Sequence, residues 1–384
     1  MTAAPHFFLI AGEPSGDRLG VALMSGLKRL SPGCTFAGIG GPAMQAEGLT
    51  SLFPMQELSI MGLTEVLPKY RALKRRIKQS AEAALAANPA ALITIDSPDF
   101  CLRVARLVKA ARPDTKTIHY VAPSVWAWRP GRAAKMARVI DHVLALLPFE
   151  PPYMTAAGMT CDFVGHPVTA EPIATAAEAQ AFRQTHGIAA DAPLIVTLPG
   201  SRRGEISRLI PPFGATLRLI ADQHPDLRVI LPTLVHLKDT VTRLTQDWPG
   251  QPVVLTAPDL PTRTAAFAAA DAALAASGTV SLELAAQGCP MVIAYDMAPL
   301  TLWLMRRMAR IDSVTLVNLV SETRSVPEFI GADCRPEKIA PALLALLAHG
   351  PGAQTAAMAE TMQRLGKDGP PPGLRAASSV LARL

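Results

Sequence analysis

The feature that most constrains this chain is a series of short, unbroken apolar runs separated by helical patterns, and the series occurs twice. In the N-terminal half the runs predict strands at residues 7–11, 35–39, 91–95, 117–121 and 143–147. The C-terminal half repeats the pattern at residues 194–198, 228–231, 253–255, 272–275 and 291–295. Continuous apolar strands that alternate with helices are typical of parallel sheets covered on both faces. We therefore predict an α/β fold with two doubly wound domains, whose ligands bind at the carboxyl ends of the strands, in a cleft between the domains.

The domain boundaries follow from the segment between the two series. Residues 165–191 are rich in Ala, Pro and Glu, which favours a linker. We place an N-terminal domain at residues 1–168 and a C-terminal domain at residues 169–350. We expect residues 351–384 to form a helical tail that packs back on the N-terminal domain.

Charge and cysteine content narrow the classes of partner. The net charge of +6 suits a nucleic acid, an acidic membrane surface or a phosphorylated substrate. No helix-turn-helix, RNA-recognition or zinc signature is present, so we expect no nucleic-acid partner. The five cysteines form no CxxC pair, which argues against a zinc site and a disulfide framework. We expect no signal peptide and no transmembrane helix, because no apolar run approaches about 20 residues.

Two loops after strands in the N-terminal half carry carboxylates. The loop AGEPSGD at residues 11–17 places Glu13 and Asp17 around a glycine-bracketed turn. Carboxylates repel phosphate and suit sugar hydroxyls, although a tight turn with a helix cap explains the loop about equally well. Asp96 directly follows the apolar run 91–95, and a carboxylate at the end of a buried strand could act as a base in the cleft. A cap or turn role is the alternative for Asp96.

Two tryptophans follow the strand at residues 117–121. Trp126 and Trp128 are two residues apart in a chain with only 5% aromatic residues. They could stack on a sugar or line an acyl groove. Ordinary core packing is the competing interpretation.

Two loops in the C-terminal half could bind a diphosphate. Ser201, Arg202 and Arg203 follow the strand at residues 194–198, where backbone N–H groups and an arginine fork suit phosphate oxygens. The spacing does not choose between the two arginines, and a solvated basic loop is the alternative.

The second of these loops opens a helix. Ser277, Gly278 and Thr279 follow the strand at residues 272–275, and a helix N-terminus favours anions. Glu283, one turn further on, could accept hydrogen bonds from ribose hydroxyls, whereas a plain strand-to-helix connection is the alternative. The two loops outline a diphosphate–ribose pocket. We expect no cofactor and no metal, because no DxD motif offers Mg²⁺ ligands.

A basic amphipathic segment occupies residues 60–78. Its apolar residues recur at helical spacing and include Val66, Leu67, Tyr70 and Leu73, and Arg75 and Arg76 lie among its basic residues. Such a segment can lie in an anionic membrane interface. The alternative is a helix with a core-facing stripe and a solvated basic face. A second segment of similar character at residues 300–310 favours the membrane interpretation.

With these motifs together, the chain resembles the lipid-A-disaccharide synthases, glycosyltransferases of GT-B architecture. The matching stretches are AGEPSGD (11–17), GIGGPAMQAEG (38–48), IMGLTEVLP (60–68), IDSPDF (95–100), KTIHYVAPSVWAWR (116–129), LPFE (147–150), FVGHP (163–167), LPGSR (198–202), ASGTVSLE (276–283) and SVTLVNL (313–319). They run in order over nearly the whole chain, and several are long and otherwise rare.

The resemblance implies two Rossmann-like domains that face each other across a cleft. The N-terminal one would take the acceptor and face the membrane, and the C-terminal one would bind the UDP-sugar. The reaction it implies is an inverting transfer from UDP-2,3-diacylglucosamine to 2,3-diacylglucosamine 1-phosphate (lipid X), which gives a β-1,6-linked disaccharide and UDP. The resemblance also implies a cytoplasmic protein that binds peripherally to the anionic inner face of the inner membrane of a Gram-negative bacterium. A homodimer is compatible with it.

The resemblance also implies roles for single residues. Asp96 matches the position of the base for the acceptor 6-hydroxyl, and Arg202 matches an arginine suited to the charge that develops on UDP. The remaining matches are donors to the diphosphate at Ser201, Ser277, Gly278 and Thr279, a ribose acceptor at Glu283, a cleft position at Asn318, and contacts to the acceptor or transferred sugar at Glu13 and Asp17. The chain departs from the family at Pro14, where Ala is usual, and after Asn318, where we assign no roles.

Two other functions remain open at this point. A UDP-N-acetylglucosamine 2-epimerase-like enzyme of the same architecture would share the UDP pocket but would need neither an acyl groove nor a membrane patch. A basic peripheral membrane-binding protein without catalysis would need none of the polar residues at strand ends. Stabilisation by UDP separates the enzymes from the binding protein.

Overall fold

The computed structural model describes residues 4–58, 63–129, 131–297, 307 and 311–384, and for residues 63–70 it describes the backbone alone. Contacts divide the chain into two compact units. Unit 1 comprises Met1–Ala170 with Leu365–Leu384, and unit 2 comprises Glu171–Arg364. The segment that returns to unit 1 is therefore shorter than the predicted tail 351–384, because helix α15 (Ala353–Arg364) stays in unit 2.

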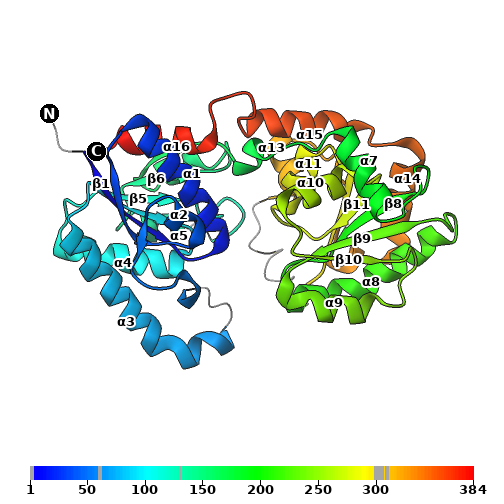
Figure 1. The fold of residues 1–384 in the computed structure, drawn as a ribbon, viewed down its shortest axis with the longest axis horizontal. Coiled ribbons are helices and arrows are strands. Elements are labelled where there is room, and N and C mark those ends of the chain that lie inside the picture. The colour runs from blue at the N-terminus through cyan, green and yellow to red at the C-terminus, as the bar shows by residue number, and fades with distance from the viewer. Residues whose placement is uncertain (1–3, 59–62, 130, 298–306, 308–310) are drawn as a thin grey trace. The chain divides into compact units, whose positions relative to one another are not determined.

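Unit 1 is built on a parallel sheet with the described strands in the order β3-β2-β1-β4-β5-β6-β7 (Figure 1). The strands are β1 (His6–Ala11), β2 (Thr35–Ile39), β3 (Thr50–Ser51), β4 (Ala91–Ile95), β5 (Thr117–Tyr120), β6 (His142–Ala145) and β7 (Thr160–Phe163). The helices are α1 (Pro14–Leu30), α2 (Pro42–Ala46), α3 (Leu63–Ala87), α4 (Pro98–Ala111), α5 (Gly131–Met136), α6 (Pro151–Thr155) and α16 (Pro372–Leu381), with 3-10 turns at Met55–Glu57 and Pro167–Ala170. The strand order reverses between β1 and β4. The loops after these two strands therefore lie side by side at the carboxyl edge of the sheet.

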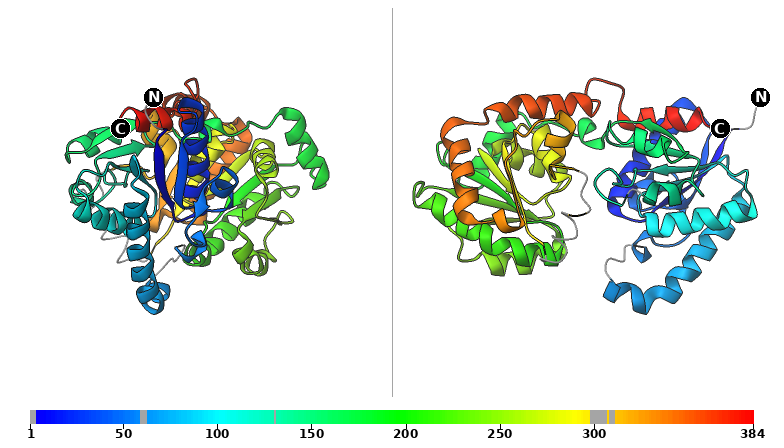
Figure 2. Two further views of the ribbon diagram at one scale, coloured as in Figure 1. Left: turned by 60° about the vertical axis from the view of Figure 1, so that its left-hand side comes forward. Right: turned by 180° about the vertical axis from the view of Figure 1, so that it is seen from behind.

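Helices cover both faces of this sheet. α1 packs on α16 and α3 packs on α4, and the two pairs lie on opposite faces (Figures 1 and 2). This arrangement follows from right-handed crossovers, because α1 leads from β1 to β2 on one side of the reversal and α4 leads from β4 to β5 on the other. Strand residues such as Phe7, Leu9 and Ile93 are fully buried between the helical layers.

Unit 2 repeats the design with the described strands in the order β10-β9-β8-β11-β12-β13, all parallel to their neighbours. The strands are β8 (Leu194–Leu198), β9 (Arg228–Thr233), β10 (Val253–Thr256), β11 (Ala272–Ala275), β12 (Met291–Tyr295) and β13 (Glu328–Ile330). The helices are α7 (Ala176–Thr185), α8 (Arg203–Ala221), α9 (Lys238–Thr245), α10 (Leu260–Ala269), α11 (Val280–Ala286), α13 (Leu316–Ser321), α14 (Pro336–His349) and α15, with 3-10 turns at Val235–Leu237 and Gly331–Asp333. α8 packs on α14, and α7 packs on α10. The strand order reverses between β8 and β11, so the loops after those strands are neighbours.

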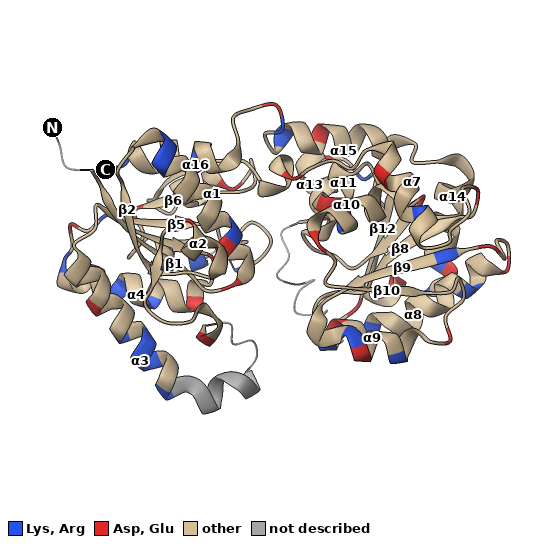
Figure 3. Ribbon diagram, in the orientation of Figure 1, with Lys and Arg blue, Asp and Glu red and all other residues tan. Residues whose placement is uncertain are grey.

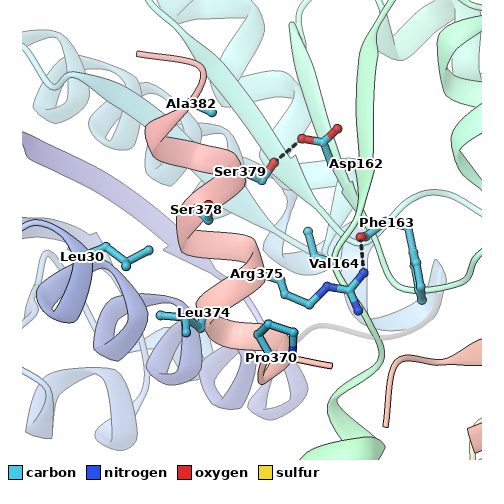
Figure 4. A pocket seen from close by; sticks show the side chains of 10 residues that line it. All are labelled: Leu30, Asp162, Phe163, Val164, Pro370, Leu374, Arg375, Ser378, Ser379 and Ala382. Atoms are coloured by element: carbon cyan, nitrogen blue, oxygen red, sulfur yellow. Dashed lines mark hydrogen bonds between the residues drawn. The ribbon is translucent and has the colours of Figure 1, made fainter. Parts of the chain in front are cut away.

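The end of the chain is fixed to unit 1 by α16. Ser379 Oγ donates to Asp162 Oδ2 at 2.7 Å and lies 2.8 Å from His142 Nε2, and Arg375 Nη2 donates to Phe163 O at 2.9 Å (Figure 4). A pocket of about 470 Å³ lies beside these contacts, between α16 and the end of β7. None of the predicted site residues lines this pocket.

The predicted α/β fold with parallel sheets is confirmed, and each of the ten predicted strands coincides with an observed one. The strands β3, β7 and β13 were not predicted. All three lie at sheet edges, and their burial is incomplete. Short, half-exposed edge strands lack the continuous apolar run that identified the others.

Candidate functional site

Asp96 follows β4 directly, and its backbone is strained. Its φ is 52° and that of Ser97 is 44°, so two successive residues adopt the left-handed conformation that few non-glycine residues take. The Asp96 N–H donates to Tyr120 O at 2.9 Å, which ties the turn to β5. Asp96 itself remains partly exposed. Strained backbone of this kind is concentrated at functional sites.

The loops after β1 and β4 fit closely together. A Cβ atom at Gly12 would lie 2.5 Å from Ser97 Oγ, so only glycine permits this approach. Because β1 and β4 pair in parallel, the structure brings Glu13 and Asp96 to the same edge of the sheet.

Glu13 is the N-cap residue of α1 and is partly exposed. Pro14, where this chain departs from the family pattern, is the first residue of the helix. That position suits proline, because its fixed φ matches the helix and its missing N–H is not needed there. The departure therefore leaves the loop intact.

Asp17 is hydrogen-bonded inside unit 1, and its expected contact with a sugar stays a prediction. Only 5% of the residue is exposed. Its Oδ1 accepts from the N–H groups of Gly41 at 2.8 Å and Met44 at 3.1 Å, and its Oδ2 accepts from Ala43 N–H at 3.1 Å. The carboxylate therefore caps α2 from within the core of unit 1, and its acceptors are directed at protein donors.

The two tryptophans after β5 have different surroundings. Trp126 is buried, its ring packs edge-on against Phe149 at 5.0 Å between centroids, and its Nε1–H donates to Glu150 Oε1 at 3.3 Å. Trp126 is therefore packed inside unit 1, and its expected contact with a sugar or an acyl chain stays a prediction. Trp128 is only half-buried, with the Arg129 guanidinium 4.1 Å from its ring centroid, and it remains a candidate contact.

Glu150 was missed as an individual residue, although it lies in the LPFE stretch. It is buried and accepts from Leu146 N–H at 3.1 Å and Leu147 N–H at 3.0 Å in addition to Trp126. Burial raises the pKa of Glu150 to about 7, and these donors oppose the rise. Its carboxylate joins the loops after β5 and β6.

In unit 2 the loop after β8 is organised by a carboxylate that sequence analysis did not single out. Glu205 Oε2 accepts from Ser201 N–H at 3.0 Å and Arg202 N–H at 3.2 Å, and its Oε1 accepts from Arg202 Nη1 at 3.1 Å and Tyr295 Oη at 3.2 Å. Gly200 has φ of 109°, and a Cβ atom there would lie 2.6 Å from Glu205 Oε2. The side chain of Arg202 is 68% exposed.

The neighbouring loop after β11 presents exposed backbone. Gly278 and Thr279 are exposed, and Thr279 is the N-cap residue of α11. Ser277 is half-buried, and its Oγ donates to Val314 O at 2.9 Å. Because β11 pairs in parallel with β8, this loop starts beside the loop that holds Arg202.

Glu283 lies in the first turn of α11 and is partly exposed. Arg263 Nε of α10 lies 3.4 Å from Glu283 Oε2, and Arg263 Nη2 lies 3.9 Å from Glu171 Oε2. The Glu283 carboxylate is thus held beside a cation at the carboxyl edge of unit 2.

Asn318 is fully buried within unit 2, and its expected position in the substrate cleft stays a prediction. Its Nδ2 donates to Val326 O at 2.9 Å, and its Oδ1 accepts from Val326 N–H at 3.0 Å. Glu328 Oε1 lies 3.4 Å from the same Nδ2. The side-chain amide therefore holds the segment after β12 together from inside unit 2.

Residues 63–78 of the predicted membrane segment lie in α3, which carries Lys and Arg residues along its described part (Figure 3), and residues 60–62 lie outside the described residues. Leu73 is half-buried and packs against the core of unit 1, and its entry into a membrane stays a prediction. Arg76 donates to both carboxylate oxygens of Glu57, at 2.8 and 2.7 Å, and lies 4.3 Å from the ring centroid of Phe53. It too is tied to unit 1.

The remaining residues named in the predicted membrane segment are either exposed or outside the residues whose side chains are described. Arg75 is exposed. The side chains of Val66, Leu67 and Tyr70 lie outside the described residues, as do residues 300–310 apart from Arg307. Within the described part of the chain, no helix combines the length and hydropathy of a membrane span. The same residues hold no group of three or more His, Cys, Asp or Glu side chains placed to bind a metal.

Two parallel-sheet units in one chain, each with polar loops at its carboxyl edge, define the class of GT-B enzymes. Solved structures of that class match the fold. UDP-GlcNAc 2-epimerase from Neisseria meningitidis bound to UDP-GlcNAc matches with a TM-score of 0.64 and 10% identity, over 98% of this chain and 97% of that one. HepE from Anabaena in complex with UDP and glucose matches with a TM-score of 0.59 and 14% identity, over 99% of both chains. At these identities the likeness establishes the fold.

Sequence relatives establish the family. The family model described as lipid-A-disaccharide synthetase matches residues 7–369. The lipid-A-disaccharide synthase of Ruegeria pomeroyi is 63% identical over 383 residues, which is 98% of this chain and 95% of that protein. The one from Rhodospirillum centenum is 48% identical over 378 residues, 97% and 93% of the two chains. The chain therefore belongs to the lipid-A-disaccharide synthase family, and it is a glycosyltransferase of lipid A biosynthesis.

Proposed function

We propose that this glycosyltransferase transfers 2,3-diacylglucosamine from UDP to the 6-hydroxyl of 2,3-diacylglucosamine 1-phosphate (lipid X). The products are a β-1,6-linked disaccharide 1-phosphate and UDP. The family match over residues 7–369 supports this reaction. The observation that carries the proposal is the strained, partly exposed Asp96 at the end of β4, beside the loop that holds Glu13.

Asp96 is the base of the proposed reaction. Inversion in a single displacement requires a proton acceptor at the attacking hydroxyl. As the acceptor oxygen bonds to the anomeric carbon, its proton passes to the Asp96 carboxylate. The bond from that carbon to the diphosphate oxygen breaks at the same time, and UDP leaves with the electron pair. Glu13 and Trp128, both partly exposed in unit 1, contact the sugars.

Unit 2 binds the UDP portion in this proposal. The exposed Arg202 and Ser201 meet the charge that develops on the leaving diphosphate. Ser277, Gly278 and Thr279 add donors from the neighbouring loop, and Glu283 accepts hydrogen bonds from the ribose. The proposal requires no metal.

The proposed place of action is the cytoplasmic side of the inner membrane of a Gram-negative bacterium. Both substrates carry acyl chains, so the enzyme has to collect them from a lipid surface. Arg71, Lys74, Arg75 and Lys78 are exposed on α3, where they suit anionic headgroups. Val66, Leu67 and Tyr70 are the apolar residues proposed to enter the interface. A homodimer remains a prediction.

Replacing Asp96 with Asn tests the proposal for the base. The change keeps the size of the side chain and removes its basicity, so we expect turnover to fall by about 10²–10⁴-fold. Binding of UDP, measured by titration calorimetry, should stay within about twofold of the unchanged protein, because UDP binds unit 2.

Asp99→Asn is the matched control, because Asp99 is an exposed carboxylate in the first turn of α4, three residues away. It should leave turnover unchanged. An Asp96→Asn protein that turns over at the normal rate would exclude Asp96 as the base.

A further inference from the structure

We infer that Glu205 and Tyr295 are positioning residues that hold Arg202 in the orientation needed to meet the diphosphate of the sugar donor. The inference rests on the proposed function, since it takes Arg202 as the residue that meets the leaving group. Neither Glu205 nor Tyr295 needs to touch the substrate for this role.

Glu205 is the centre of the arrangement. Its side chain is only 15% exposed. One oxygen accepts from the backbone N–H groups of Ser201 and Arg202, and the other accepts from the Arg202 guanidinium at 3.1 Å. The same carboxylate therefore fixes both the backbone and the side chain of Arg202, which removes conformational freedom that a ligand would otherwise have to restrict.

Tyr295 holds Glu205 from another strand. It is the last residue of β12, whereas Glu205 lies in the first turn of α8 after β8. Because β11 lies between β8 and β12 in the sheet, the 3.2 Å bond from Tyr295 Oη to Glu205 Oε1 spans the carboxyl end of β11. The loop with Ser277, Gly278 and Thr279 begins at that end, so the hydrogen bond between Tyr295 and Glu205 lies at the proposed diphosphate site.

The protonation state of Tyr295 suits this role. Burial and the adjacent Glu205 carboxylate raise the pKa of Tyr295, so its hydroxyl stays protonated and donates. Arg202, by contrast, remains 68% exposed and uses one guanidinium nitrogen on Glu205. Its other N–H groups are available for phosphate oxygens.

A purely electrostatic role for Glu205 makes the opposite prediction. A carboxylate near a diphosphate repels it, so removing the charge would tighten UDP binding. If Glu205 positions Arg202, removing the charge loosens the guanidinium and weakens UDP binding. The sign of the change therefore separates the two roles.

The test is calorimetric titration of the full chain with UDP, using Glu205→Gln and Tyr295→Phe, each alone and combined with Arg202→Ala. We expect the dissociation constant to rise about tenfold for Glu205→Gln and about threefold for Tyr295→Phe. In the Arg202→Ala background, neither change should alter it further by more than about twofold, because residues that act through Arg202 are not additive with its loss.

Glu178→Gln is the matched control. Glu178 caps α7 as Glu205 caps α8, by accepting from the N–H and hydroxyl of Thr175. This variant should bind UDP normally even if it melts at a lower temperature. The melting temperatures of all variants show the loss of helix capping. The change in UDP affinity with and without Arg202 shows whether Glu205 positions that residue.

Two results would overturn the inference while leaving the proposed function in place. One is unchanged or tighter UDP binding by Glu205→Gln when Arg202→Ala weakens it. The other is an equal effect of Glu205→Gln with and without Arg202, which would mean that Glu205 acts only as a cap. Failure of the unchanged protein to bind UDP would overturn both.

Discussion

Asp17 and Asp96 lie in neighbouring parts of unit 1, and their surroundings differ. Asp17 is buried with three backbone N–H donors directed at it, whereas Asp96 is partly exposed on a strained turn. The sequence motifs place both near a strand end but do not show which carboxylate is satisfied internally. The partners of Asp17 lie at the start of helix α2, beginning 24 residues further along the chain, and that contact was not predictable from the spacing.

Asp17→Asn should therefore affect stability more than chemistry. An amide cannot accept on both sides, so at least one buried N–H loses its partner, at a cost of about 1–3 kcal/mol. We expect a lower melting temperature and a turnover per folded molecule within about tenfold of normal. A normal melting temperature with abolished turnover would instead support the predicted contact between Asp17 and a sugar.

Trp126 and Asn318 show the same limit of prediction at the residue scale. Each belongs to a motif that matches the family, yet each is buried with its polar group bonded internally, Trp126 to Glu150 and Asn318 to Val326. A motif match identifies a residue that matters. It does not distinguish contact with a substrate from support of a loop.

At the scale of elements, the strands of both sheets were predictable because each is a continuous apolar run buried on both faces. The edge strands, and the contacts that join loops distant in sequence, were not predictable in this way. The packing of α16 on unit 1 likewise depends on a close contact between glycines of α1 and α16, which could not be predicted from the sequence. A Cβ atom at Gly26 of α1 would lie 2.5 Å from Gly373 O, and one at Gly373 would lie 2.4 Å from Ala22 O.

Gly26→Ala should consequently loosen α16. The added methyl group meets backbone rather than a flexible side chain, so we expect a loss of about 1–3 kcal/mol and faster tryptic cleavage at Arg375. Gly204→Ala is the control, because Gly204 lies in α8 with open space around it. If both variants resist trypsin equally well, the glycine contact does not hold α16 in place.

At the scale of the whole molecule, each unit contributes a different part of the proposed reaction. Unit 1 carries Asp96 and Glu13 at one reversal of strand order, and unit 2 carries Arg202 and Thr279 at the other. The two series of apolar runs predicted two doubly wound sheets with ligand sites at their strand ends, but they did not predict where the strand order reverses. The hydrogen bond between Tyr295 and Glu205 was not predictable from the sequence either, because it joins α8 to β12, which lies two positions from β8 in the sheet.

The most direct measurement is a mixed-micelle assay with UDP-2,3-diacylglucosamine and lipid X, in which UDP is quantified and the lipid product is identified by mass. We predict one disaccharide 1-phosphate formed for each UDP released, with no divalent metal required. UDP released without a disaccharide would contradict the proposed acceptor. An absence of turnover with UDP still bound would contradict the proposed transfer and favour epimerase-like chemistry in the same fold.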